Sequence, residues 1–161
     1  MFSHSKKPTT AVECAQAAIK IIAVCALFIW DSGCTPAFNW REIAFDGQPV
    51  AALLPCKPDR GARQVVLAGA PREMVMAGCE AGGAMFTVAV IDVQDVQKLA
   101  ATEKELRAVN KATHIRYAQH GSVLVQAAVY GQPNASRDGP GALSTEAIET
   151  FFTGLKLPTK P

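Results

Sequence analysis

An uninterrupted apolar run of ten residues, 21–30 (IIAVCALFIW), constrains the organisation of this chain more than any other feature. A transmembrane helix needs about 20 apolar residues. Extending the run backwards to that length would bring Lys20 and Glu13 into the bilayer, where charged side chains are costly. Basic residues precede the run and small residues follow it, which is the pattern of a secretory signal. We therefore expect a hydrophobic targeting helix within residues 1–36 and a single domain in residues 37–161.

The end of this run resembles the signal of bacterial lipoproteins. Ser32, Gly33 and Cys34 match the small residues and the Cys that, in that family, is lipidated and becomes the mature N-terminus. Asp31 departs from the family pattern, because the third position before the Cys is normally Leu or another aliphatic residue. Cys34 is therefore the lipidation candidate. Two alternatives stay open: an uncleaved anchor in which Lys20 snorkels toward the interface, and a buried helix of a cytosolic domain.

This interpretation places the protein in a bacterial cell envelope. We expect a periplasm-facing domain that is attached to the membrane by a lipid or by a single N-terminal anchor. The sixteen basic and fourteen acidic residues are scattered along the chain. Because no stripe of Lys and Arg could follow a phosphate backbone, nucleic acid is not expected as a partner.

The expected compartment determines how the cysteines are interpreted. Of the five cysteines in the chain, Cys56 and Cys79 belong to the mature domain. An even pair in an oxidising compartment predicts a disulfide, and closing a loop of about two dozen residues would stabilise the fold by roughly 3 kcal/mol. Two free thiols, or one functional thiol, are the alternatives. A zinc site is not expected, because zinc prefers four closely spaced ligands and no His is near either Cys in the sequence.

The first half of the domain has the pattern of β-strands. Residues 40–45 alternate loosely, Asp46 and Gly47 then give a hairpin signal, and residues 50–54 can form the return strand. Three further β-rich runs follow and are expected to form an antiparallel meander; a later run adds another strand. The continuous apolar character near the end of the meander predicts a central strand that is buried on both faces. These runs are residues 63–68, 72–77, 84–91 and 122–130.

Two helices are expected in the second half. Residues 92–113 contain no Gly or Pro, and Asp92 or Asp95 can cap their start. Glu103 and Arg107 are spaced to form an i,i+4 ion pair. The apolar stripe of this helix is Val96, Leu99, Leu106 and Val109. A second helix starts near Ser144, and its apolar face, expected to dock on the sheet, is Ala147, Ile148, Phe151, Phe152 and Leu155.

The predicted fold class is therefore α+β, an antiparallel sheet of about five to six strands with two helices packed on it. This order of elements accompanies two short motifs, LLPCKP at 53–58 and FFTGLKL at 151–157. Over residues 40–157 the chain resembles small uncharacterised proteobacterial lipoproteins and envelope proteins and, more distantly, the PsbP-like fold. PsbP-like domains are mostly accessory or binding modules without catalytic residues. The resemblance thus implies an accessory or binding role and transfers no functional residue.

Motifs of known chemistry are absent from the sequence. It contains no G-x-S-x-G, P-loop, G-x-G-x-x-G, H-E-x-x-H or S-x-x-K, so we assign no catalytic residue, cofactor or metal site. Isolated candidates exist nonetheless. His114 and His120 flank the start of a predicted strand and could approach Cys56, and Glu73 and Glu80 could form a carboxylate pair. The final candidate group, interpreted as core fillers or as a methionine-lined binding patch, is Met74, Met76 and Met85.

The preferred interpretation is a non-enzymatic envelope module that binds a protein partner or supports an assembly. Two alternatives compete with it. One is an enzyme with a dispersed site, such as a hydrolase that uses Cys56 or Glu80 with His120. The other is a small-ligand carrier that uses the sheet face, with residues 131–141 as a lid, and that requires a pocket of roughly 300 Å³ or more.

Overall fold

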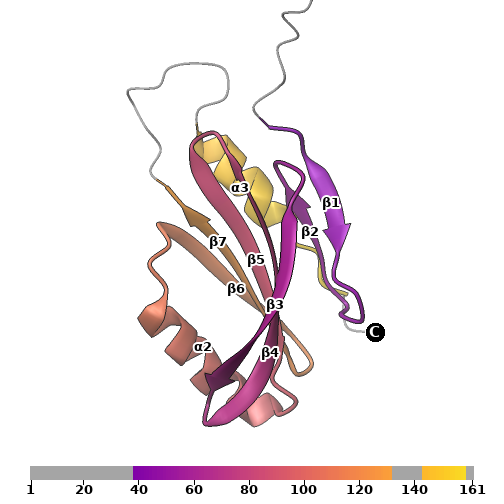
Figure 1. Ribbon diagram of the computed structural model, residues 1–161, viewed down its shortest axis with the longest axis vertical. Helices are drawn as coiled ribbons and strands as arrows, with labels where there is room; N and C mark the ends of the chain where they lie inside the picture. The colour runs from indigo at the N-terminus through magenta and orange to yellow at the C-terminus, as the bar shows by residue number, and fades with distance from the viewer. Residues whose placement is uncertain (1–37, 132–142, 159–161) are drawn as a thin grey trace, which may run out of the picture. The chain divides into compact units, whose positions relative to one another are not determined.

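The computed structural model describes residues 38–131 and 143–158. The predicted targeting segment with Cys34, and most of the predicted lid, lie outside these residues. The described part is α+β, as the sequence predicts (Figure 1). In chain order its elements are β1 (Arg41–Ala44), β2 (Ala51–Leu54), β3 (Asp59–Leu67), β4 (Ala70–Ala81), β5 (Ala84–Asp92), the 3-10 turn η1 (Val96–Lys98), α2 (Leu99–Val109), β6 (His114–His120), β7 (Val123–Tyr130) and α3 (Thr145–Thr153).

Among the described residues the strands form two sheets, whereas the sequence predicts one. β1 and β2 pair as the expected hairpin, and Gly47 adopts the positive φ of +72° that its turn requires. The other strands form a five-stranded sheet in the order β3-β4-β5-β7-β6, in which all neighbours are antiparallel. The meander of β3, β4 and β5 is confirmed. So is the central position of β5, whose residues from Val88 to Ile91 are all buried.

The edge strand β6 is absent from the sequence prediction. Its seven residues, HIRYAQH, show no apolar alternation, because the strand is partly exposed on both faces. It pairs on one side only, with β7, and the tight turn between the two strands contains Gly121 at a φ of +58°. Pairing with a strongly apolar neighbour, rather than its own pattern, makes this segment a strand.

One face of the large sheet packs against α3 and the β1–β2 hairpin, which together enclose the main core. Ser144 caps α3, its hydroxyl accepting a hydrogen bond from the Ala147 amide at 3.1 Å. Phe151 of α3 meets Phe86 of β5 edge to face, with 5.3 Å between ring centroids. Beyond α3, Lys156 pairs its backbone with Ala51 of β2. The predicted docking of this helix on the sheet is thereby confirmed.

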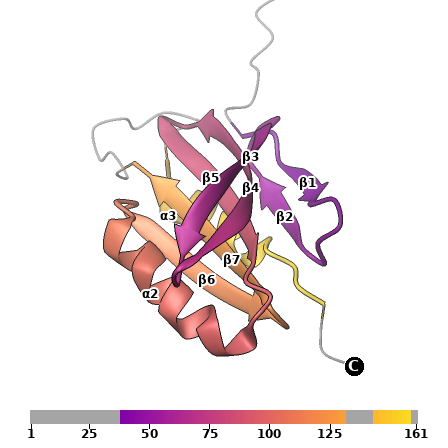
Figure 2. The same cartoon turned by 60° about the horizontal axis from the view of Figure 1, so that its bottom comes forward.

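The opposite face packs against α2, so the two helices lie on different sides of the sheet (Figures 1 and 2). The predicted helix over residues 92–113 is too long. Asp95 caps the short turn η1 by accepting from the Gln97 amide, and α2 spans only eleven residues. The predicted apolar stripe is half wrong. Leu99 and Leu106 are buried, whereas Val96 is 63% exposed and Val109 is 73% exposed.

The Cys56–Cys79 disulfide is present, with 5.9 Å between the two Cα atoms. It joins the connection between β2 and β3 to the twelve-residue strand β4. Cys79 is buried in the main core and Cys56 packs at its margin. The disulfide therefore holds the β1–β2 hairpin against the sheet that it covers.

Candidate functional site

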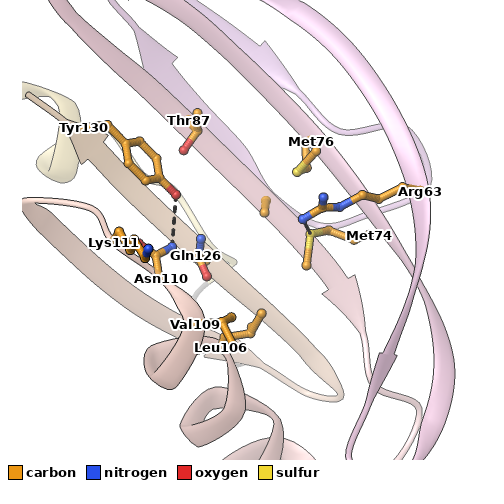
Figure 3. A pocket seen from close by; sticks show the side chains of 11 residues that line it. Arg63, Met74, Met76, Thr87, Leu106, Val109, Asn110, Lys111, Gln126 and Tyr130 are labelled. Carbon is orange, nitrogen blue, oxygen red and sulfur yellow. Dashed lines mark hydrogen bonds between the residues drawn. The ribbon is translucent and has the colours of Figure 1, made fainter.

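A groove opens on the face of the sheet that α2 covers, at the point where this helix ends (Figure 3). We call it the α2 groove. Its volume of about 370 Å³ lies within the range of about 300–1,000 Å³ that is usual for small-molecule sites. Strands β3, β4, β5 and β7 and the end of α2 supply its lining, which is Arg63, Met74, Met76, Thr87, Ala89, Leu106, Val109, Asn110, Lys111, Gln126 and Tyr130.

The floor of the groove follows from strand register. Met76, Ala89 and Gln126 are direct cross-strand neighbours on β4, β5 and β7. Because side chains alternate along a strand, all three point to the same face. α2 ends at Val109 and leaves this row open, and the methyl group of Ala89 gives the floor its depth. The groove is therefore the part of the sheet face that a short helix does not reach.

One polar side chain is buried in this apolar floor. Gln126 is 8% exposed, and its Oε1 accepts a hydrogen bond from the Tyr117 hydroxyl at 3.1 Å. Within the described residues its Nε2 has no hydrogen-bond partner, and Figure 3 shows this nitrogen directed into the groove. Buried side-chain atoms without a partner in the described residues are Arg72 Nε and Thr102 Oγ1, so the Gln126 nitrogen is reached by water in the open groove rather than sealed from it. A ligand acceptor in the groove would satisfy it.

The Tyr117 hydroxyl is held in its protonated, donating form. Burial raises the pKa of Tyr117 above its ordinary value of 10.0; the nearby Arg107 cation opposes this shift, and Glu103 and Tyr130 add to it. Arg107 lies over the Tyr117 ring, 4.3 Å from its centroid, and pairs with Glu103 at 2.7 Å. The predicted pair between Glu103 and Arg107 is thus confirmed. This cluster fixes the phenol that orients Gln126.

A second hydrogen bond shapes the wall of the groove. Asn110 Nδ2 donates to the Tyr130 hydroxyl at 3.1 Å, while Asn110 Oδ1 accepts from the Ala112 amide at 2.7 Å. The first residues after α2 are thereby tied to the end of β7. Tyr130 is 37% exposed, so its ring forms part of the wall rather than of the core.

The charges of the groove have one sign. Arg63 and Lys111 reach it from opposite sides (Figure 3), and no Asp or Glu of the described chain belongs to its lining. The side-chain contact of Arg63 is Nη2 to Met74 Sδ at 3.8 Å, and a thioether is a weak acceptor. Its guanidinium therefore keeps donors for a ligand. Asp59 and Glu80 point to the same face of the sheet but lie outside the lining.

A second hollow of about 430 Å³ adjoins the α2 groove, and we call it the β3 hollow. It lies between β3 and α2, and its lining is mostly aliphatic. Glu105 supplies its one carboxylate among the described residues, and this group accepts a hydrogen bond from the Ala68 amide at 2.8 Å. Both cavities share Arg63, Met74, Leu106 and Val109, so they are neighbours along α2.

The predicted histidine and cysteine site does not form. His114 begins β6 and His120 ends it, instead of flanking the start of one strand. They are six positions apart on an extended strand, a separation of about 20 Å. Cys56 is bonded to Cys79, which removes the free thiol that a Cys–His pair needs. The alternative of two free thiols is also wrong in this structure.

The carboxylates are likewise separated. Glu73 and Glu80 lie seven positions apart on β4, so their side chains point to opposite faces. Glu80 shares its row with Met85 and Tyr130, whereas His120 pairs with Val123 at the other end of the sheet. That end is about 20 Å away along the strands. The dispersed hydrolase site is therefore not assembled by this fold.

The methionines divide between the two predicted roles. Met74 is buried against α2, and together with the half-buried Met76 it lines the α2 groove. Met85 is 41% exposed and lies outside the groove, so its prediction as a core filler is wrong. The sequence does contain a signal for the groove that we missed, a single Gln126 within the otherwise apolar strand VLVQAAVY. A polar residue in such a run indicates a partner or a site.

Within the described ranges, 38–131 and 143–158, no group of three His, Cys, Asp or Glu side chains converges in a way that could hold a metal ion. No helix in these ranges combines the length and the apolar character that crossing a membrane requires.

Comparison with known proteins adds no relative. No family model, no curated protein and no solved structure matches this chain. The resemblances to proteobacterial lipoproteins and to the PsbP-like fold therefore stay predictions, and the candidate site rests on its own geometry.

Proposed function

We propose that this protein is a non-enzymatic binding module of the cell envelope and that it holds a small ligand in the α2 groove. One observation carries the proposal. The groove has the volume of a small-molecule site, and the amide nitrogen of Gln126, without a partner among the described residues, faces into it. A mostly apolar cavity with a few convergent polar groups is the usual form of a ligand site.

The composition of the groove favours binding over chemistry. Its lining in the described chain contains no His, Cys, Ser, Asp or Glu, the residues that most often act as nucleophile or general base. The polar groups that it does present, on Arg63, Asn110, Lys111, Gln126 and Tyr130, are suited to orienting a ligand.

The envelope setting is part of the proposal. It is supported by the signal-like residues 21–34 and by the Cys56–Cys79 pair, since disulfides persist in oxidising compartments. In this arrangement the N-terminal segment, or a lipid on Cys34, attaches the protein to the membrane. The binding domain then faces the periplasm.

The methionines provide a direct test. The chain has four, and Met74 and Met76 line the groove whereas Met85 does not. Full-length protein labelled with ¹³C at the methionine methyl groups is titrated with a mixture of small apolar, anionic and cationic compounds. We expect shifts at Met74 and Met76 and none at Met85. If no compound shifts the two groove methyl groups, the proposal is wrong.

A filling substitution supplies the matched control. Val109→Trp places an indole at the rim of the groove, while Val96→Trp changes a similarly exposed residue that lines neither cavity. Both sites are exposed, so neither change disturbs the core. We expect Val109→Trp to weaken any groove ligand and Val96→Trp to leave its affinity unchanged. Equal effects of the two substitutions would contradict binding in the groove.

A protein partner, the preferred interpretation from the sequence, is the second candidate. The supporting observation is β3, an edge strand of nine residues whose first six are exposed. An exposed edge can pair with an extended peptide. A photo-crosslinker at Ala62 of β3 tests this in the native envelope, with Ala100 on α2 as the control position. Crosslinking to an envelope protein from Ala62 alone would support it, and equal yields would contradict it.

A further inference from the structure

We infer that the ligand is a single-chain amphiphile with an anionic head group, which binds in the α2 groove while its tail extends into the β3 hollow. This inference rests on the proposed function and adds the chemistry of the ligand and its direction. Three features support it: the sign of the charges, the position of the neutral donors and the continuity of the two cavities.

The charges select an anion. Arg63 and Lys111 are the charged residues of the α2 groove in the described chain. The nearest acidic residues on α2 are already engaged, Glu103 with Arg107 and Glu105 with the Ala68 amide. A guanidinium presents several donors in a plane that matches carboxylate and phosphate oxygens. A head group between these two cations would face no carboxylate of the lining.

Neutral donors complete the head-group site. The Nε2 of Gln126, without a partner among the described residues, rises from the floor, and the Tyr130 hydroxyl stands above it (Figure 3). Because Asn110 Nδ2 donates to that hydroxyl, the phenol proton stays free to bond a ligand oxygen. These groups are concentrated in the α2 groove. The same groups are absent from the lining of the β3 hollow within the described residues.

The β3 hollow suits the tail. Val65 and Leu67 of β3 face Leu106 and Val109 of α2 across it. Val109 is 73% exposed, so an apolar chain would remove its surface from water. Val109, Met74 and Leu106 line both cavities, so a chain can pass from one to the other along apolar side chains. Arg63 also lines both cavities, and the aliphatic part of its side chain can contact the tail while its charge stays with the head group.

Four probes separate the contributions of head and tail. Dodecanoate, dodecanol, dodecylammonium and butanoate are titrated into full-length, methyl-labelled protein in detergent-free buffer. We expect dodecanoate to shift Met74 and Met76 and to bind about tenfold or more tightly than dodecanol, because hydrogen bonds to a charged group contribute about 1.5–3 kcal/mol. Dodecylammonium should bind more weakly than dodecanol. Butanoate should bind more weakly than dodecanoate.

Substitutions assign each part of the probe to its cavity. Arg63→Gln and Lys111→Gln should each weaken dodecanoate severalfold and leave dodecanol unchanged. Lys104→Gln, on the exposed side of α2, is the matched control. Ala108→Asp, at an exposed residue that lines the β3 hollow and not the α2 groove, should weaken dodecanoate but not butanoate, whose chain is too short to reach the β3 hollow. Val96→Asp is the control for that change, since Val96 lines neither cavity.

The outcomes distinguish this inference from the proposed function. If dodecanol or dodecylammonium shifts the Met74 and Met76 signals and binds with the same affinity as dodecanoate, the inference of an anionic head group is wrong. The proposal that the groove binds a ligand would still hold. If Ala108→Asp affects dodecanoate and butanoate equally, the placement of the tail is wrong. If no probe and no compound of the earlier mixture shifts either methyl group, the groove is not a ligand site, and both proposals are wrong.

Discussion

At the scale of single residues, the fold depends on small side chains where two elements meet. Gly154 follows α3, and its carbonyl accepts a hydrogen bond from the Leu53 amide of β2 at 3.1 Å. A Cβ at this position would overlap Leu53 Cβ. Gly154 has an ordinary negative φ of −75°, so space rather than backbone conformation explains the glycine. Close packing of this kind leaves little tolerance for an added methyl group.

Gly154→Ala should therefore destabilise the protein by about 1–3 kcal/mol, because Leu53 or the helix end must shift. Urea unfolding of the full-length protein measures the change. Gly61→Ala is the matched control, since a Cβ at Gly61 meets nothing within 4 Å, and alanine favours an ordered strand over glycine by a fraction of a kcal/mol. Equal destabilisation by the two substitutions would refute the explanation.

Residue-scale reasoning from the sequence identified the cysteine pair but not the groove. Cys56 and Cys79 could be paired because few alternatives remained within the domain. Gln126 became interpretable only when the register placed it beside Ala89 on one side and Tyr117 on the other. Its neighbours in space are 37 and nine residues away along the chain. No local pattern contains that information.

At the scale of elements, capping and length decide where each helix acts. α3 begins at Thr145, directly after Ser144, the residue that the sequence favours as its start. α2 instead begins after the turn η1 and ends at Val109, four residues before the predicted limit. The predicted apolar stripe of α2 is wrong at both ends. Val96 lies in the turn η1, and Val109 is the last residue of α2, where its side chain is exposed instead of packed on the sheet.

Ser144→Ala should weaken α3. The substitution removes the hydroxyl that accepts from the Ala147 amide and should cost about 1 kcal/mol of stability. The loss is measurable by chemical unfolding, since α3 carries Ile148, Phe151 and Phe152 into the main core. Ser144→Asp preserves an acceptor at the cap and should retain wild-type stability. An alanine variant as stable as the aspartate variant would show that the cap contributes nothing.

At the scale of the whole molecule, the disulfide and the compartment are linked. Cys56 and Cys79 are 23 residues apart, and a loop of this size corresponds to roughly 3 kcal/mol in the chain-entropy model. The doubly substituted protein, Cys56→Ala with Cys79→Ala, should be less stable by about that amount. Reduced wild-type protein should show a similar loss in urea unfolding. Unchanged stability in both samples would contradict a structural role for the bridge.

The same cysteines test the envelope proposal in the native host. If the domain faces the periplasm, Cys56 and Cys79 in the membrane fraction should react with an alkylating reagent only after reduction. Intact mass then separates the modes of attachment. A mature form that begins at Cys34 with added acyl mass would identify a lipoprotein, and an intact N-terminus would identify an uncleaved anchor. Thiols that react without reduction would argue against export.

The sequence by itself determined the α+β class, the β1–β2 hairpin, the β3-β4-β5 meander, the start of α3 and the cysteine pair. Each depends on local periodicity, turn residues or a short inventory of one residue type. Only the tertiary structure decided that the strands form two sheets, that β6 is an edge strand, and that α2 leaves one row of the sheet uncovered. These features arise from pairing between distant segments, where the neighbour's surface, not the segment's own pattern, sets the conformation.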